Sequence, residues 1–304
     1  MPKPYHPIDT QHVLMLLRQW LKAVAPPEGV DWLDRVRDML NDAAPDAFFF
    51  HAFALAPKLV GTGPLRLRPD DHAEAERARA GWRPALWTAD QAARTTLLLV
   101  YDDSDPVAYG DMLAHVLRAG DRTKAATLYR ALPLLPYPER HVHWAQEALR
   151  SDDRTLFEAL ALFNPYPAEF FDETCWNRMI LKAAFLGVPV ADIAGLERRA
   201  NTVLAHELRD FARQLYDGGR RVPVGMWQAA GDKVANHVVD DLAAMLNGPD
   251  VDMAMAAALA LARSRDPRAG EALAACPELA DAVRSGRLTW DRLSAGSPSL
   301  RAVG

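Results

Sequence analysis

Apolar residues recur every three or four positions along most of the chain, which is the spacing of one face of an α-helix. Near the N-terminus, Val13, Leu17 and Leu21 belong to such a stripe, which stops before the proline pair at 26–27. The same spacing returns at 88–101, 106–118, 122–131, 139–149, 154–163, 173–186, 202–216, 224–234, 237–246 and 251–263. Because strand-like alternation is nearly absent, the sequence predicts an all-α fold.

One apolar run could also be a buried strand. The segment TTLLLVY at 95–101 is continuous rather than periodic, but it follows TADQAAR, which has the pattern of a helix start. We therefore expect the whole of 88–101 to be helical.

Short polar residues precede several of the predicted helices. Asp121, Asp172 and Asn201 can each accept hydrogen bonds from the free N–H groups of a first helical turn, and Asp152 or Asp153 can do so before 154–163. Short helices joined by short turns favour antiparallel neighbours. Because no fixed repeat period is present, the pattern predicts an irregular α-solenoid of antiparallel helical pairs, HEAT-like towards the C-terminus.

We expect one helical-repeat-like domain over 1–304. Within it, the polar stretch at 64–84 is either an exposed helix or an exposed, mobile insertion, and 294–304 is a flexible tail.

The charge balance excludes some partners. With a formal net charge of -5 and a pI of about 6.0, the chain lacks the basic surface that nucleic acids or anionic membranes attract. The longest apolar runs, 48–56 and 253–262, are too short to span a bilayer. The two cysteines, Cys175 and Cys276, have no CxxC partner, so we expect reduced thiols and no structural zinc. These features predict a cytoplasmic protein that does not span a membrane.

The stretch NPYPAEFFDETCWNRMILKAAFLG at 164–187 is the most unusual part of the sequence. Two prolines predict an extended corner at 164–167, where Asn164 can bond the backbone just after it. Asn177 and Lys182 then interrupt an apolar helix, and Arg198 and Arg199 are expected in the last turn of a helix before Asn201. A rigid corner with Tyr166 packed over it, a snorkelling lysine and solvated arginines are the structural alternatives.

The functional hypothesis is that these polar side chains converge on one locus that binds a ligand or a partner. A few polar groups in apolar surroundings are typical of small-molecule sites. The candidate residues are Asn164, Tyr166, Asn177, Lys182, Arg198 and Asn201.

Four motifs occur in one order: NPYP at 164–167, WNxMxLK at 176–182, RxN at 199–201 and GRRVPVGMW at 219–227. By them the segment 154–227 resembles the EboA family of bacterial proteins. That resemblance implies an all-helical fold. It also implies a gene cluster with a membrane prenyltransferase-like protein, a metal-dependent-hydrolase-like protein and sugar-phosphate-enzyme-like proteins, linked to making or moving a small metabolite towards the periplasm.

The familiar catalytic motifs GxGxxG, GxxxxGK[ST], HExxH and GxSxG are absent from the sequence. His141 and His143 are two apart, a poor metal pair on a helix, and we interpret them as exposed or capping histidines. No cofactor and no metal site are expected.

We expect a non-catalytic helical scaffold or binding protein associated with biosynthesis or export of a small metabolite. Its expected partners are other proteins of the same gene cluster, including the membrane prenyltransferase-like protein. The alternative is an enzyme of that pathway, acting on an isoprenoid- or cyclitol-type metabolite in a pocket around Tyr166, Asn177 and Lys182.

Overall fold

The computed structural model describes residues 8–42, 44–118 and 121–296. Their regular structure is helical, and an isolated bridge pairs Pro64 with Thr88. The prediction of an all-α fold is therefore confirmed. The solenoid arrangement and its HEAT-like end stay predictions.

The chain divides into two compact units, Met1–Phe171 and Asp172–Gly304. Compact units can belong to one cooperative domain, so the expectation of a single domain also stays a prediction. Most of the expected tail at 294–304 lies outside the described residues.

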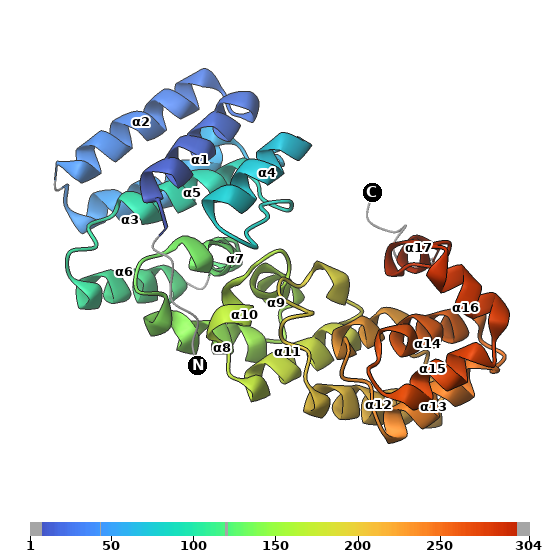
Figure 1. Cartoon of the computed structure of the whole chain (residues 1–304). Coiled ribbons are helices and arrows are strands. Elements are labelled where there is room, and N and C mark those ends of the chain that lie inside the picture. Colours follow the sequence, from blue (N-terminus) through green and yellow to red (C-terminus); the bar gives the residue numbers. More distant parts are fainter. Residues whose placement is uncertain (1–7, 43, 119–120, 297–304) are drawn as a thin grey trace. The chain divides into compact units, whose positions relative to one another are not determined.

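The first unit is built around a buried helix, α5 (Ala89–Val100), which packs against α1, α2, α3 and α7 (Figure 1). The strand-like run that starts at 95 is helical, as expected. It is continuous rather than periodic because a helix buried on several sides is apolar on more than one face. The other helices are α1 (Thr10–Val24), α2 (Pro27–Asn41), α3 (Asp46–Val60), α4 (Pro69–Ala78), α6 (Pro106–Arg118), α7 (Arg122–Ala131), η1 (Leu132–Leu134), η2 (Pro138–His141), α8 (Val142–Arg150), α9 (Arg154–Ala161) and α10 (Tyr166–Phe170).

The segment at 64–84 packs in part against the rest of the first unit. It forms α4, whose Ala75 is fully buried against the rest of the unit while the outer face stays exposed. Trp82 follows and packs against Trp20 in a tilted arrangement and against Trp87 edge to face, with ring centroids 5.6 and 5.7 Å apart. The indole Nε1 of Trp20 donates to Asp71 of α4 at 3.2 Å. The exposed outer face of α4 accounts for the polar composition of 64–84, and the buried Trp82 ring anchors the segment to the rest of the unit.

A close helix contact in this unit depends on a missing side chain. A Cβ atom at Gly29 of α2 would lie 2.3 Å from the carbonyl oxygen of Leu59 in α3. The two backbones therefore approach more closely here than any larger residue would permit.

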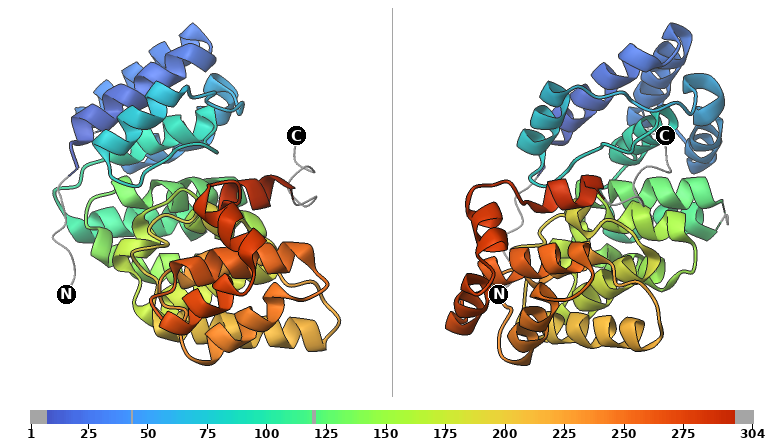
Figure 2. Two further views of the ribbon diagram at one scale, coloured as in Figure 1. Left: turned by 45° about the vertical axis from the view of Figure 1, so that its right-hand side comes forward. Right: turned by 90° about the vertical axis from the view of Figure 1, so that its right-hand side faces the viewer.

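The second unit is built around α14 (Val251–Arg263), which packs against α13, α15, α16, α17 and η4 (Figure 2, orange to red). The buried positions of α14 are mostly alanines, which let its neighbours come close. The remaining elements are α11 (Glu173–Leu186), η3 (Val190–Asp192), α12 (Thr202–Asp217), η4 (Val224–Ala230), α13 (His237–Leu246), α15 (Pro267–Ala274), α16 (Pro277–Arg284) and α17 (Trp290–Gly296).

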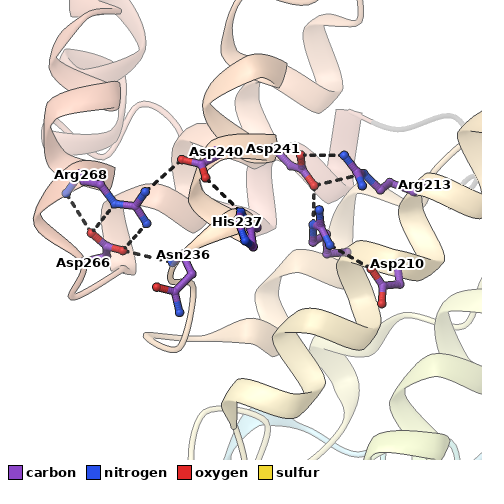
Figure 3. A network of polar contacts seen from close by, with 9 residues as sticks. Asp210, Arg213, Asn236, His237, Asp240, Asp241, Asp266 and Arg268 are labelled. Carbon is purple, nitrogen blue, oxygen red and sulfur yellow. Dashed lines mark hydrogen bonds and ion pairs between the residues drawn. The ribbon is translucent and has the colours of Figure 1, made fainter.

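Ion pairs join the outer faces of this second unit (Figure 3). Arg213 and Arg209 of α12 both contact Asp241 of α13, at 3.3 and 2.5 Å. Arg268 of α15 contacts Asp240 of α13 at 3.1 Å and Asp266 at 3.0 Å. The network therefore links α12, α13 and α15 near solvent.

The expected N-caps are confirmed. Asp121, Asp153, Asp172 and Asn201 each accept a hydrogen bond from a first-turn N–H group of the helix that follows. Neither Cys175 nor Cys276 forms a disulfide, and Cys175 is half-buried, as expected. In the part of the chain that the structure describes, no helix combines the length and apolar character needed to cross a bilayer.

Candidate functional site

The corner at Asn164 is helical rather than extended, so that expectation was wrong. Pro165 has αR dihedral angles and α10 starts at the next residue. Phe163 reverses the chain with a φ of 54°, and its carbonyl accepts from the backbone N–H of Arg83 at 3.3 Å. The Arg83 guanidinium also lies 5.2 Å from the centre of the Phe163 ring. These two contacts stabilise a backbone conformation that is uncommon outside glycine.

The side-chain amide of Asn164 forms hydrogen bonds with three backbone groups at and around this corner. Its Nδ2 donates to the carbonyl of Tyr129 at 2.9 Å and to that of Ala159 at 3.3 Å. Its Oδ1 accepts from the backbone N–H of Tyr166 at 3.0 Å, as the sequence predicted. The side chain is 3 % exposed, so it offers no hydrogen-bonding group to a ligand.

Tyr166 is fully buried. Its hydroxyl donates to the carbonyl of Pro138, and its ring stacks on Phe170 with centroids 4.7 Å apart. Burial raises the pKa of the phenol well above its ordinary value, with a smaller contribution from Glu139. Tyr166 therefore stays protonated at neutral pH and is a poor proton donor or nucleophile.

Asn177 and Asn201 meet in the second unit. The Nδ2 of Asn201 donates to Oδ1 of Asn177 at 2.9 Å, and Nδ2 of Asn177 donates back at 3.4 Å. Asn201 also donates to the carbonyl of Arg199 at 3.1 Å and accepts from the N–H of Leu204 at 2.8 Å. The pair therefore connects α11 to the start of α12.

Arg199, rather than Arg198, makes the contacts here. Its guanidinium lies 5.1 Å from the centre of the Trp176 ring and donates to the carbonyl of Asp172 at 3.2 Å. Burial lowers the pKa of Arg199. Arg198 is exposed, and residues 194–199 form turns instead of the expected last helical turn. Hydrogen-bonded turns place the two neighbouring arginines in different environments, which helical periodicity did not anticipate.

Lys182 is half-buried on α11. The structure thus brings Asn177 together with Asn201, and Asn164 with Tyr166, but these two pairs belong to different units. Convergence of all six residues on one locus stays a prediction.

The sequence interpretation missed the burial of Arg94 and of His141. Arg94 of α5 is 2 % exposed. It pairs with Asp90 at 3.1 Å and donates to the carbonyl of Phe53 at 3.0 Å. His141 stands at the N-cap position of α8, but it is 1 % exposed and its side chain makes no capping hydrogen bond, whereas His143 is exposed, as expected. An Asp four residues before an Arg on an otherwise apolar helix was the one available signal for the buried pair.

The residues described include no group of three or more His, Cys, Asp and Glu side chains that could hold a metal ion.

The first unit also contains a wide cleft of about 1220 Å³. Its wall includes Asp46, Asp102 and Asp105, and Tyr101 donates to Asp46 at 2.7 Å. Burial and the Asp46 hydrogen bond raise the pKa of Tyr101 to about 12. Asp102 and Asp105 accept from backbone N–H groups of Ser104 and Val107. These carboxylates therefore organise the start of α6.

Comparison with known protein families gives one match. The family model described as "Metabolite traffic protein EboA" matches residues 13–231, which includes the first unit from α1 onwards and part of the second. Searches of curated proteins and of solved structures each found no significant match.

Proposed function

Since the chain belongs to the EboA family, whose model is described as a metabolite traffic protein, we propose that it is a non-catalytic helical scaffold or binding protein. It acts beside the synthesis or export of a small metabolite, in the cytoplasm. Its partners are other proteins of an ebo-type gene cluster, including a membrane prenyltransferase-like protein. The helices supply extended surfaces for such partners, as arrays of short helices do in general.

The observation that carries this proposal is how the conspicuous polar residues use their hydrogen-bonding groups. Asn164 bonds three backbone groups, and Tyr166 bonds the carbonyl of Pro138. Asn177 and Asn201 bond each other. A catalytic acid, base or nucleophile needs a group that reaches the substrate with a suitable pKa. Buried groups already bonded to the fold support a structural role instead, which favours binding over catalysis.

Under this proposal, ligand or partner contacts come from the more accessible cations. Arg198 is exposed and Lys182 is half-buried, and both belong to the second unit. Asn177 is a structural member of the locus, because a buried amide without its partner costs about 1–3 kcal/mol.

The first test compares variants in the native host. Lys182→Ala and Arg198→Ala are expected to abolish pathway function while the melting temperature stays close to wild type. Lys58→Ala and Arg150→Ala remove exposed cations at the ends of α3 and α8 and serve as matched controls. Full pathway function in both second-unit variants would remove these residues from the proposed site.

A second test separates binding from catalysis. A metabolite extract from the host is incubated with the purified chain, which is present at about one hundredth of the concentration of the extracted metabolites. The composition of the extract before and after incubation is then compared by mass spectrometry. A binding protein leaves the composition unchanged and retains a metabolite in stoichiometric amount. Conversion of many equivalents of one metabolite would establish the enzyme alternative.

A further inference from the structure

The outer side of α11 combines cations with an exposed aromatic ring. Arg178, Lys182 and Phe185 follow one another at helical spacing, so they lie along one side of the helix. Arg178 is exposed, Lys182 is half-buried, and Phe185 is 56 % exposed although it is a large hydrophobic side chain. Leu181, one turn before Phe185, is half-buried. These four side chains are called the α11 face below.

Arg220 adds a cation to the α11 face from a second element. It follows the end of α12, and its guanidinium lies 5.4 Å from the centre of the Phe185 ring. Its backbone N–H donates to the carbonyl of Leu215 at 2.8 Å, and Gly219 before it has a φ of 66°, which suits glycine. The turn after α12 therefore directs Arg220 to the exposed ring. Aromatic residues and arginine are enriched at protein interfaces.

Arg178 and Arg220 differ from other arginines of the second unit in their partners. Among the described residues, no carboxylate lies within ion-pair distance of either one. Elsewhere in the unit, arginines pair with carboxylates at 2.5–3.3 Å, as do Arg209, Arg213, Arg221, Arg263, Arg265 and Arg268.

The sequence explains this difference. From 174 to 191 it contains neither aspartate nor glutamate. The carboxylate of Asp172, at the N-cap of α11, accepts from the backbone N–H of Cys175 at 2.7 Å. The α11 face therefore carries positive charge that nearby carboxylates of its own helix do not pair, and charge of this kind attracts a partner of the opposite sign.

The spacing of the cations favours a polypeptide over a compact anion. Arg178 and Phe185 are separated by two helical turns, or about 10 Å along the axis, and Arg220 lies at the Phe185 end. A phosphate is bound by donors that converge on it. Two separated cations with an apolar ring beside one of them match a chain whose carboxylates are several residues apart.

We propose that the α11 face binds an acidic segment of another protein. Carboxylates of that segment pair with Arg178 and Arg220, and an apolar side chain of the segment covers the ring of Phe185. The proposal rests on the proposed function only in taking the chain as a binding protein, and it supplies the chemistry of a partner.

The test uses the purified full chain and a fluorescent peptide of about twelve residues, long enough to span the α11 face whether extended or helical. In the peptide, glutamates flank one tryptophan, and in its control every glutamate is replaced by glutamine. Fluorescence anisotropy is expected to show the acidic peptide binding about tenfold more tightly than the control, with a smaller ratio at high salt, because exposed ion pairs are screened. Equal affinities, or binding of neither peptide, would overturn the proposal.

Variants locate the binding surface. Arg178→Ala and Arg220→Ala are each expected to weaken binding of the acidic peptide about two- to fivefold, and Phe185→Ala about tenfold. Arg213→Ala removes an exposed arginine that already has a carboxylate partner, and Val203→Ala removes an apolar side chain that is 52 % exposed on α12. Both controls are expected to bind the peptide like wild type. Losses in the controls equal to those on the α11 face would contradict the assignment.

Two further probes separate the classes of partner. Inorganic diphosphate stands for a compact anion, and vesicles containing phosphatidylserine stand for an anionic membrane. Tighter binding of either probe than of the peptide, lost in Arg220→Ala, would assign the surface to that class and overturn the proposal.

Every variant in this experiment keeps Lys182 and Arg198 and is measured in the purified chain. Its failure is therefore distinct from failure of the pathway assay with Lys182→Ala and Arg198→Ala.

Discussion

Both units pack their helices around one buried helix, but the two buried helices differ in the residues that they bury. Each surrounds one buried helix, α5 in the first and α14 in the second. The buried face of α5 includes Asp90 and Arg94, whereas that of α14 consists of alanines and leucines. Around α14 the ion pairs lie near solvent, as in the contact of Arg213 with Asp241. A buried polar group is costly once its partner is removed, while an exposed ion pair contributes little either way. The first unit should therefore be sensitive to lost hydrogen bonds, and the second to side-chain volume.

The largest effect is expected at the buried pair of α5. Asp90→Ala leaves the Arg94 guanidinium buried without its carboxylate, which typically lowers the free energy of unfolding by about 3–5 kcal/mol. Urea denaturation followed by circular dichroism measures it. In the double variant Asp90→Leu/Arg94→Met much of that stability is expected to return, since apolar replacements of buried pairs are often neutral. A loss below about 1 kcal/mol in Asp90→Ala would contradict the comparison.

Acid sensitivity is expected to follow from His141. Its pKa is about 4 in the folded chain and 6.5 ordinarily, so the unfolded chain binds more protons between these values. Stability is therefore complete above pH 6.5 and falls as the pH drops towards 4, by roughly 3 kcal/mol in total.

The measurement is the free energy of unfolding at several pH values for wild type and His141→Phe. Carboxylates titrate in the same range, so the difference between the two curves reports on His141. His143→Ala changes an exposed ring and is the control. Parallel curves for wild type and His141→Phe would show that the histidine does not titrate as expected.

On α14 we expect stability to depend on side-chain volume rather than on hydrogen bonds. Ala257 is fully buried, so Ala257→Leu forces extra volume between closely packed helices and should lower the free energy of unfolding by about 1–3 kcal/mol. Ala262→Leu, on the exposed side of the same helix, should change it by less than about 0.5 kcal/mol. Equal effects at the two positions would mean that α14 is not tightly packed.

The smallest effect is expected in the surface network. Arg213→Ala removes one of two cations on Asp241, and the remaining contact with Arg209 is kept. The expected loss is about 0.5 kcal/mol or less, and it should shrink further at high salt because exposed charges are screened. Thermal unfolding in low and high salt checks this. A large loss that is independent of salt would place Arg213 in the core of the unit.

The sequence was most informative where structure depends on residues close in the chain. Asp172 and Asn201 cap helices because the N–H groups they accept from lie only three residues away. The segment at 95–101 was correctly predicted to be helical because the turn before it contains a helix start. In each case the deciding contacts are local.

The sequence was least informative where a partner comes from far along the chain. Asn164 receives its structural role from the carbonyl of Tyr129, 35 residues away. Burial of His141 depends on packing against other elements, and no local pattern distinguishes it from exposed His143. The contact of Arg199 with Trp176 also depends on tertiary packing. Helical periodicity could not show which of Arg198 and Arg199 would make it.

The close approach at Gly29 has a consequence for other members of the family. A Cβ there would overlap the backbone of Leu59 rather than a flexible side chain, so no rotamer change can relieve the clash. A homologue with alanine or anything larger at the aligned position must therefore hold α2 and α3 further apart or pack them in a different register. This single column of a future alignment can therefore divide the family into two structural groups before any of their structures is determined.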